Sequence, residues 1–126
     1  MNQKKVLKIL LVDDERISRE VAAHLLKSGG HEVITASLPS EAIDIFEREK
    51  DSLDIIVLDM LMPEMSGKEL FYRLKQIDPK VKTILLSGYG KSSDIQEAMD
   101  HGVYYCLQKP VLRQKLLDTV LEVADR

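Results

Sequence analysis

Five short apolar runs alternate with segments of helical period, and this alternation restricts the fold more than any other feature of the chain. The runs are rich in Val, Ile and Leu and recur every 20 to 28 residues. Apolar runs of this length are typical of strands buried on both faces of a parallel sheet. The predicted strands are residues 6–12, 32–36, 55–58, 83–86 and 103–107.

The segments between the runs carry apolar residues at helical spacing, with charged residues on the other face. This spacing predicts five amphipathic helices. Ser66 with Glu69, and Ser93 with Gln96, fit capping boxes at the starts of two of them. The predicted buried faces are Ile17, Val21 and Leu25; Ala42, Ile45 and Phe46; Leu70, Leu74 and Ile77; Ile95, Ala98 and Met99; and Leu117, Leu121 and Ala124.

A strand followed by a helix, repeated five times, predicts an α/β fold of the (βα)5 type. Right-handed crossovers then place a doubly wound parallel sheet of five strands between two layers of helices, a three-layer sandwich. The chain has 126 residues, which is the size of one domain, so residues 1–126 are predicted to form a single domain.

Composition excludes several classes of partner. The apolar runs are too short to cross a bilayer, so no membrane partner is expected. The formal net charge is -3 with no long basic tract, which disfavours nucleic-acid binding. The N-terminus has no apolar region of signal-peptide length, and the single Cys106 cannot form an internal disulfide. A cytoplasmic location is therefore expected.

Polar residues stand where four of the apolar runs end: Asp13 and Asp14, Asp59, Ser87 and Lys109. In a parallel α/β sheet, ligands bind outside the carboxyl ends of the strands. The sequence therefore predicts that three carboxylates, one hydroxyl and one ammonium converge at this edge.

A single Asp after a strand is more often a loop or capping carboxylate than a ligand. Three carboxylates at one edge repel one another, and a bound cation removes the repulsion. Mg²⁺ suits a site made of one or two carboxylates, a main-chain carbonyl and waters; Ca²⁺ is the alternative, although the chain has no EF-hand loop. With a cation present, one carboxylate can attack phosphorus, while Lys109 and Ser87 supply positive charge and a donor for the phosphoryl oxygens.

Four motifs in order resemble the receiver domain of two-component response regulators, and the resemblance covers the whole chain. They are LVDDE at residues 11–15, VLDMLMPEMSG at 57–67, LLSGYG at 85–90 and LQKP at 107–110. The last two, without an output domain, are similar to receivers of hybrid sensor histidine kinases. The resemblance implies the flavodoxin-like strand order 2-1-3-4-5.

The resemblance also implies the chemistry of the site. Asp59 would accept a phosphoryl group from a histidine of a histidine kinase or a histidine phosphotransfer domain. Lys109 would pair with the phosphoryl oxygens, Ser87 would bind one of them on activation, and the bond from Lys109 to Pro110 would be cis. The Mg²⁺ ligands would be Asp13, directly or through water, Asp14, Asp59 and the main-chain carbonyl of Leu61.

Two departures from the family pattern affect the expected switch. Cys106 stands where receivers usually carry a Tyr or Phe that moves with Ser87. By strand alternation Tyr104 is predicted to share the face of Cys106, and it is the candidate substitute for the switch ring; simple packing of Tyr104 and Tyr105 is the alternative. Leu61 and Tyr89 stand where receivers often place polar residues, and their bulk predicts slow hydrolysis of the phosphoryl group.

The sequence thus predicts a phosphorylation-dependent signalling switch that catalyses its own phosphoryl transfer and dephosphorylation and is not a metabolic enzyme. The alternative is a receiver-like interaction module that works without phosphorylation. A phosphatase of the haloacid-dehalogenase type is disfavoured, because Leu61 stands where its second acid belongs. An output or kinase domain in the full-length protein, and a weak homodimer, remain open.

Overall fold

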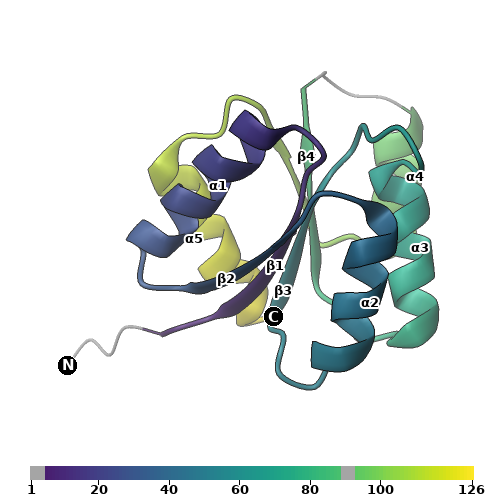
Figure 1. Ribbon diagram of the computed structural model, residues 1–126, viewed down its shortest axis with the longest axis horizontal. Helices are drawn as coiled ribbons and strands as arrows, with labels where there is room; N and C mark the ends of the chain where they lie inside the picture. The colour runs from purple at the N-terminus through teal and green to yellow at the C-terminus, as the bar shows by residue number, and fades with distance from the viewer. Residues whose placement is uncertain (1–4, 89–92) are drawn as a thin grey trace.

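Five strands and five helices alternate in the computed structural model, which describes residues 5–88 and 93–126 (Figure 1). Each strand begins and ends within two residues of its predicted bounds. The elements are β1 (Lys8–Val12), α1 (Arg16–Ser28), β2 (Glu32–Ala36), α2 (Pro39–Glu49), β3 (Ile55–Asp59), α3 (Gly67–Ile77), β4 (Thr83–Ser87), α4 (Ser93–Asp100), β5 (Tyr105–Gln108) and α5 (Arg113–Ala124).

The strands form one parallel sheet in the order β2-β1-β3-β4-β5, which confirms the predicted fold. Helices α1 and α5 cover one face, and α2, α3 and α4 cover the other (Figure 1). Side chains of β1 alternate between the two sides: Ile9 and Leu11 lie under α1 and α5, whereas Leu10 and Val12 lie under the other three helices. Burial on both faces explains why the strands are apolar throughout.

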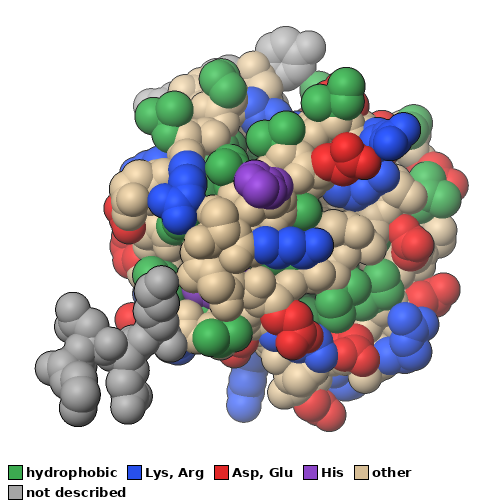
Figure 2. Space-filling model, turned by 60° about the vertical axis from the view of Figure 1, so that its left-hand side comes forward, with side chains coloured by type: hydrophobic (Ala, Val, Ile, Leu, Met, Phe, Trp, Pro, Cys, Tyr) green, Lys and Arg blue, Asp and Glu red, His purple; other side chains and the backbone are tan. Residues whose placement is uncertain are grey.

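The predicted buried face of α1 is wrong for two of its three residues, and the third, Leu25, is half-buried against the core. Ile17 and Val21 are 72% and 54% exposed, and the helix buries Ala22, Ala23 and Leu26 instead. The helical period is correct but its phase is shifted, because small alanine side chains let the helix lie close to the sheet. The space-filling view shows hydrophobic side chains exposed among charged ones on this side of the molecule (Figure 2).

The other helices follow their predicted faces more closely. The three predicted residues of α2 are buried, as are Leu70 and Leu74 of α3 and Ala98 of α4. Helix α5 buries Leu117 as predicted, but Leu121 and Ala124 are only half-buried. Its buried residues are Leu116, Leu117, Thr119, Val120 and Val123.

One of the two predicted capping boxes is confirmed in part. The Ser66 hydroxyl accepts the N–H of Glu69 at 3.1 Å and caps α3. The second is wrong: Ser93 is the first residue of α4, not the residue before it, and the side-chain amide of Gln96 donates forward to Asp100 at 2.9 Å. Within residues 5–88 and 93–126, no helix is long and apolar enough to span a membrane.

Candidate functional site

The five polar residues predicted at strand ends lie together at the carboxyl edge of the sheet. Asp59 and Ser87 end β3 and β4, and the other three follow β1 and β5. One carboxylate oxygen from each of Asp13, Asp14 and Asp59 lies within 4.8 Å of the others. Lys109 Nζ lies 3.3 Å from both Asp13 Oδ2 and Asp59 Oδ1. The main-chain N–H of Lys109 donates to the carbonyl of Ser87 at 2.7 Å, which joins the ends of β4 and β5.

Asp13 is fully buried and firmly held. Its Oδ1 accepts the N–H of Glu15 at 2.9 Å, and its Oδ2 accepts the hydroxyl of Ser18 at 2.5 Å. The guanidinium of Arg19 donates to its main-chain carbonyl at 2.9 Å. Asp14, by contrast, is exposed to solvent. Ser18 also accepts from Lys109 Nζ at 3.0 Å, so it belongs to the site although no motif pointed to it.

The carboxyl of Asp59 is hard to ionise in this setting. Burial and the negative charge of Asp13 raise the pKa of Asp59 to about 6, against the opposing effects of Lys109 and the N–H of Leu61. The pKa of Lys109 is also affected by burial, which lowers it, but the charges of Asp59 and Asp13 outweigh burial and the pKa is raised. Lys109 is therefore positively charged at neutral pH, and it holds one positive charge against three carboxylates.

This donor set fits a hard divalent cation. Three carboxylate oxygens within a few Å of one another are the ligand type that Mg²⁺ takes in proteins. The ammonium of Lys109 offsets only part of the negative charge, so a cation here would relieve the remaining repulsion that raises the pKa of Asp59. Asp13, Asp14 and Asp59 are the side chains that would hold it.

The loop after Asp59 folds back onto the end of β3. The N–H of Gly67 donates to the carbonyl of Met60 at 2.9 Å. A Cβ at Gly67 would lie 2.4 Å from the main-chain oxygen of Asp59, so a larger residue would push the loop away from the site. Leu61, within this loop, is 57% exposed. The peptide bond between Lys109 and Pro110 is cis, as predicted.

The structure contradicts the predicted placement of Tyr104. Cys106 packs on the side of α2, α3 and α4, whereas Tyr104 and Tyr105 both pack on the side of α1 and α5. Strand β5 begins only at Tyr105, so strand alternation does not extend to Tyr104. Burial raises the pKa of the half-buried Cys106 thiol, which keeps it protonated. Tyr89, the other residue expected to affect phosphoryl lifetime, lies outside the described residues.

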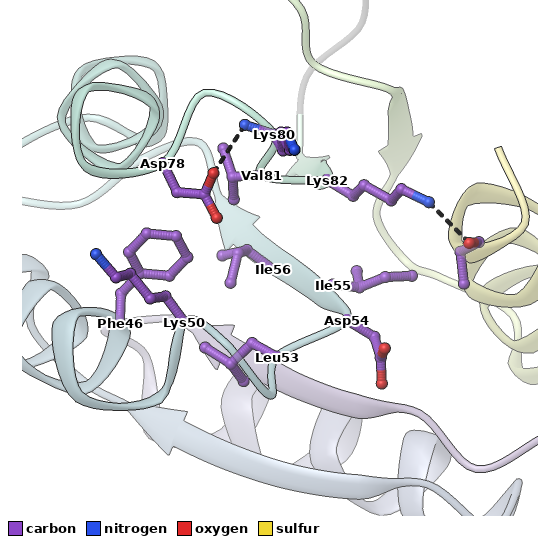
Figure 3. Close-up of a pocket in the computed structure, with 11 residues that line it drawn as sticks. Phe46, Lys50, Leu53, Asp54, Ile55, Ile56, Asp78, Lys80, Val81 and Lys82 are labelled. Atoms are coloured by element: carbon purple, nitrogen blue, oxygen red, sulfur yellow. Dashed lines mark hydrogen bonds between the residues drawn. The ribbon is translucent and has the colours of Figure 1, made fainter.

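A separate cavity of about 240 Å³ lies at the opposite edge of the sheet, around the start of β3. Figure 3 shows two hydrogen bonds among its lining residues: the main-chain N–H of Lys80 donates to Asp78, and the ammonium of Lys82 donates to the carbonyl of Ala124. Ile55 and Ile56 of β3 also line this cavity. It adds no group to the site at the carboxyl edge.

Comparison with known proteins identifies the family. Residues 9–121 match the model of the response regulator receiver domain. The chain is 32% identical to sporulation initiation phosphotransferase F of Bacillus subtilis (strain 168), covering 90% of both chains. It is 33% identical to the sensor kinase CckA of Brucella abortus (strain 2308), covering 94% of this chain and 12% of the kinase.

Solved structures agree with this assignment. A response regulator receiver domain protein from Clostridium thermocellum matches with a TM-score of 0.92, 35% identity and 96% coverage of both chains. Among the sequence relatives, the transcriptional regulatory protein GlrR of Escherichia coli (strain K12) is 32% identical over 89% of this chain, and the chain spans only 25% of that protein. The chain thus spans a quarter or less of several relatives and nearly all of others. It belongs to the family of response regulator receiver domains.

Proposed function

We propose that this receiver domain, residues 1–126, is a phosphorylation-dependent switch whose phosphoryl acceptor is Asp59. Receiver domains are signalling modules and not metabolic enzymes. The observation that carries the proposal is the position of Asp59, with Lys109 Nζ 3.3 Å from its Oδ1 and the carboxylates of Asp13 and Asp14 beside it. The donor is a phosphohistidine of a histidine kinase or a histidine phosphotransfer domain.

In the transfer, a carboxylate oxygen of Asp59 forms a bond to phosphorus as the bond from phosphorus to the donor imidazole nitrogen breaks. The imidazole keeps the electron pair and takes up a proton. Asp13, Asp14, Asp59 and the carbonyl of Leu61 would hold Mg²⁺, and the positive charge of the bound ion would lower the repulsion between the two anions. Lys109 stabilises the charge that develops on the phosphoryl oxygens.

Ser87 connects this chemistry to the output surface. It ends β4, and its carbonyl accepts the N–H of Lys109, so a movement of its hydroxyl toward a phosphoryl oxygen is felt at the ends of β4 and β5. The surface that changes is formed by α4, β5 and α5. Cys106 is too small to act as a switch ring, and Tyr104 packs on the other side of the sheet. The conformational change is therefore proposed to pass through the packing of α4 against Cys106 and not through an aromatic side chain.

Leu61 is proposed to prolong the phosphorylated state. It is two residues after Asp59, apolar and 57% exposed, so it offers no polar group to orient an attacking water. Leu61→Asn shortens the phosphoryl lifetime several-fold, because the amide can hold that water in line. Phosphoprotein decay followed by intact mass measures this, and an unchanged lifetime would contradict it.

The proposed setting is the cytoplasm, with the phosphohistidine donor as partner and no contact with nucleic acid or membrane by this domain. An output or kinase domain in the full-length protein, and a weak homodimer through the output surface, are consistent with the proposal. The sensor kinase and transcriptional regulators among the relatives support the larger assembly, since the chain spans only part of each.

Incubation with a small acyl phosphate and Mg²⁺, followed by intact mass measurement, tests the proposal. Wild type gains one phosphoryl group; Asp59→Asn gains none. Asp51→Asn is the matched control, because Asp51 is an exposed carboxylate in the loop after α2 and the variant is modified like wild type. A wild-type protein without an adduct would favour the interaction module that works without phosphorylation.

A further inference from the structure

The hydroxyl of Ser18 links Asp13, which follows β1, to Lys109, which follows β5. Ser18 lies in the first turn of α1 and is half-buried. Its hydroxyl donates to Asp13 Oδ2 at 2.5 Å and accepts from Lys109 Nζ at 3.0 Å. The hydroxyl therefore uses its donor and one acceptor position within the site.

The contact with Ser18 completes the surroundings of the Lys109 ammonium. An ammonium has three N–H donors, and three oxygens lie within reach of Nζ: Asp13 Oδ2 at 3.3 Å, Asp59 Oδ1 at 3.3 Å and Ser18 Oγ at 3.0 Å. Ser18 is the nearest of the three. Lysine has a flexible four-carbon stem, so these contacts and not the side chain itself fix the direction of the charge.

Ser18 is also fixed in place by its own surroundings. Asp13, to which it donates, is fully buried, and its main chain is tied to β2 by a bond from its N–H to the carbonyl of Ala36 at 3.1 Å. Arg19, the next residue of α1, donates to the carbonyl of Asp13. Hydrogen bonds thus join the start of α1 to the end of β1 on both sides of the hydroxyl.

We propose that Ser18 is a positioning residue for phosphoryl transfer, an inference that rests on the proposed function. During transfer one N–H of Lys109 passes from Asp59 to a phosphoryl oxygen, while Ser18 and Asp13 hold the other two. Without the hydroxyl, the ammonium keeps a single anchor outside Asp59. The ammonium is then held less firmly beside the phosphoryl group, and the rate of transfer falls although Asp13, Asp14 and Asp59 are intact.

The matched pair Ser18→Thr and Ser18→Val tests this, because the two side chains have nearly the same shape and differ in the hydroxyl. At saturating acyl phosphate and Mg²⁺, the Thr variant phosphorylates within about twofold of wild type. The Val variant is slower by about tenfold, as expected for the loss of one hydrogen bond to a charged group. Ser28→Ala, at the far end of the same helix, serves as the control and keeps the wild-type rate.

A second measurement needs neither phosphorylation nor metal. The ammonium resonance of Lys109 in a ¹⁵N-labelled sample stays sharp in wild type and the Thr variant, and broadens through faster exchange with water in the Val variant. Equal rates and equal resonances for Thr and Val, in a domain that phosphorylates normally, would overturn the role of Ser18 alone. A wild-type domain that is not phosphorylated would overturn the proposed function and the positioning role together.

Discussion

Lys109 Nζ lies 3.3 Å from Asp59 Oδ1, and yet the pKa of Asp59 is raised to about 6. A neighbouring ammonium lowers the pKa of a carboxyl, but here burial and the charge of Asp13 are stronger. Lys109 is also shared with Asp13, 3.3 Å away. Without a metal ion, the one ammonium does not balance the three carboxyl groups of the site, as expected for a site that binds a divalent cation.

Lys109→Met raises the pKa of Asp59 further above 6 in the metal-free protein, because the ammonium 3.3 Å from its Oδ1 is lost while Asp13 remains. A carboxyl titration by nuclear magnetic resonance measures the shift. Lys27→Met, which removes an exposed charge from α1, leaves the pKa of Asp59 as it is. An Asp59 pKa that stayed the same or fell in Lys109→Met would be at odds with the geometry.

Asp59→Asn stabilises the metal-free domain at pH 8, on the order of 1 kcal/mol in the free energy of unfolding. A raised pKa means that the fold disfavours the charged carboxyl, so wild type gains stability as pH falls through about 6 toward 3.8, where the unfolded chain also takes up the proton. The advantage of Asp59→Asn therefore shrinks over that range. Denaturant unfolding at several pH values checks this; a variant less stable than wild type at pH 8 would contradict it.

His31 gives a pH dependence of the opposite sign. Burial lowers its pKa, and its Nδ1 accepts the N–H of Leu7 at 3.1 Å, which only an unprotonated Nδ1 can do. Its contribution to stability is complete above pH 6.5 and is lost as pH falls through 6.5 toward the lowered pKa of the fold.

His31→Asn keeps an acceptor but cannot titrate, so the difference in unfolding free energy shifts in favour of the variant between pH 7 and pH 5. The contribution of Asp59 is common to both proteins and cancels. A constant difference between His31→Asn and wild type across this range would show that His31 does not titrate with folding.

Helix α1 offers a direct comparison of its two apolar faces. Leu26→Ala costs about 2–5 kcal/mol, because Leu26 is fully buried. Ile17→Ser changes the free energy of unfolding by no more than about 0.5 kcal/mol, because Ile17 is 72% exposed. Urea unfolding of both variants measures the two free energies, and a loss for Ile17→Ser as large as that for Leu26→Ala would contradict the observed exposure of Ile17.

The strands and the site could be predicted because burial on both faces leaves an unbroken apolar run, and a polar residue at the end of four of the five runs marks the edge of the sheet. Asp13, Asp59 and Lys109 were found in this way. The strand order came from the family resemblance and not from the pattern. The face of α1 could not be predicted, since Val21 and its neighbours Ala22 and Ala23 are all apolar and spacing alone does not set the phase.

Ser18 and Tyr104 show two further limits of the sequence. Serine in a first helical turn is ordinary, and only the fold brings Ser18 within reach of Lys109, 91 positions later in the chain. Tyr104 was misplaced because alternation holds only within a strand, and the boundary of β5 lies one residue beyond it. The contact of Ser18 and the side on which Tyr104 packs both depend on how helices and strands pack together. The spacing of apolar residues along the chain does not predict that packing.

The position of the phosphoryl group distinguishes Asp59 from the other carboxylates of the site. Wild type is treated with an acyl phosphate and Mg²⁺, then with borohydride, which reduces an aspartyl phosphate to homoserine, and its peptides are sequenced by mass spectrometry. We expect homoserine at position 59 and unmodified residues at Asp13 and Asp14. Homoserine at either of those two positions, or at none, would contradict this expectation.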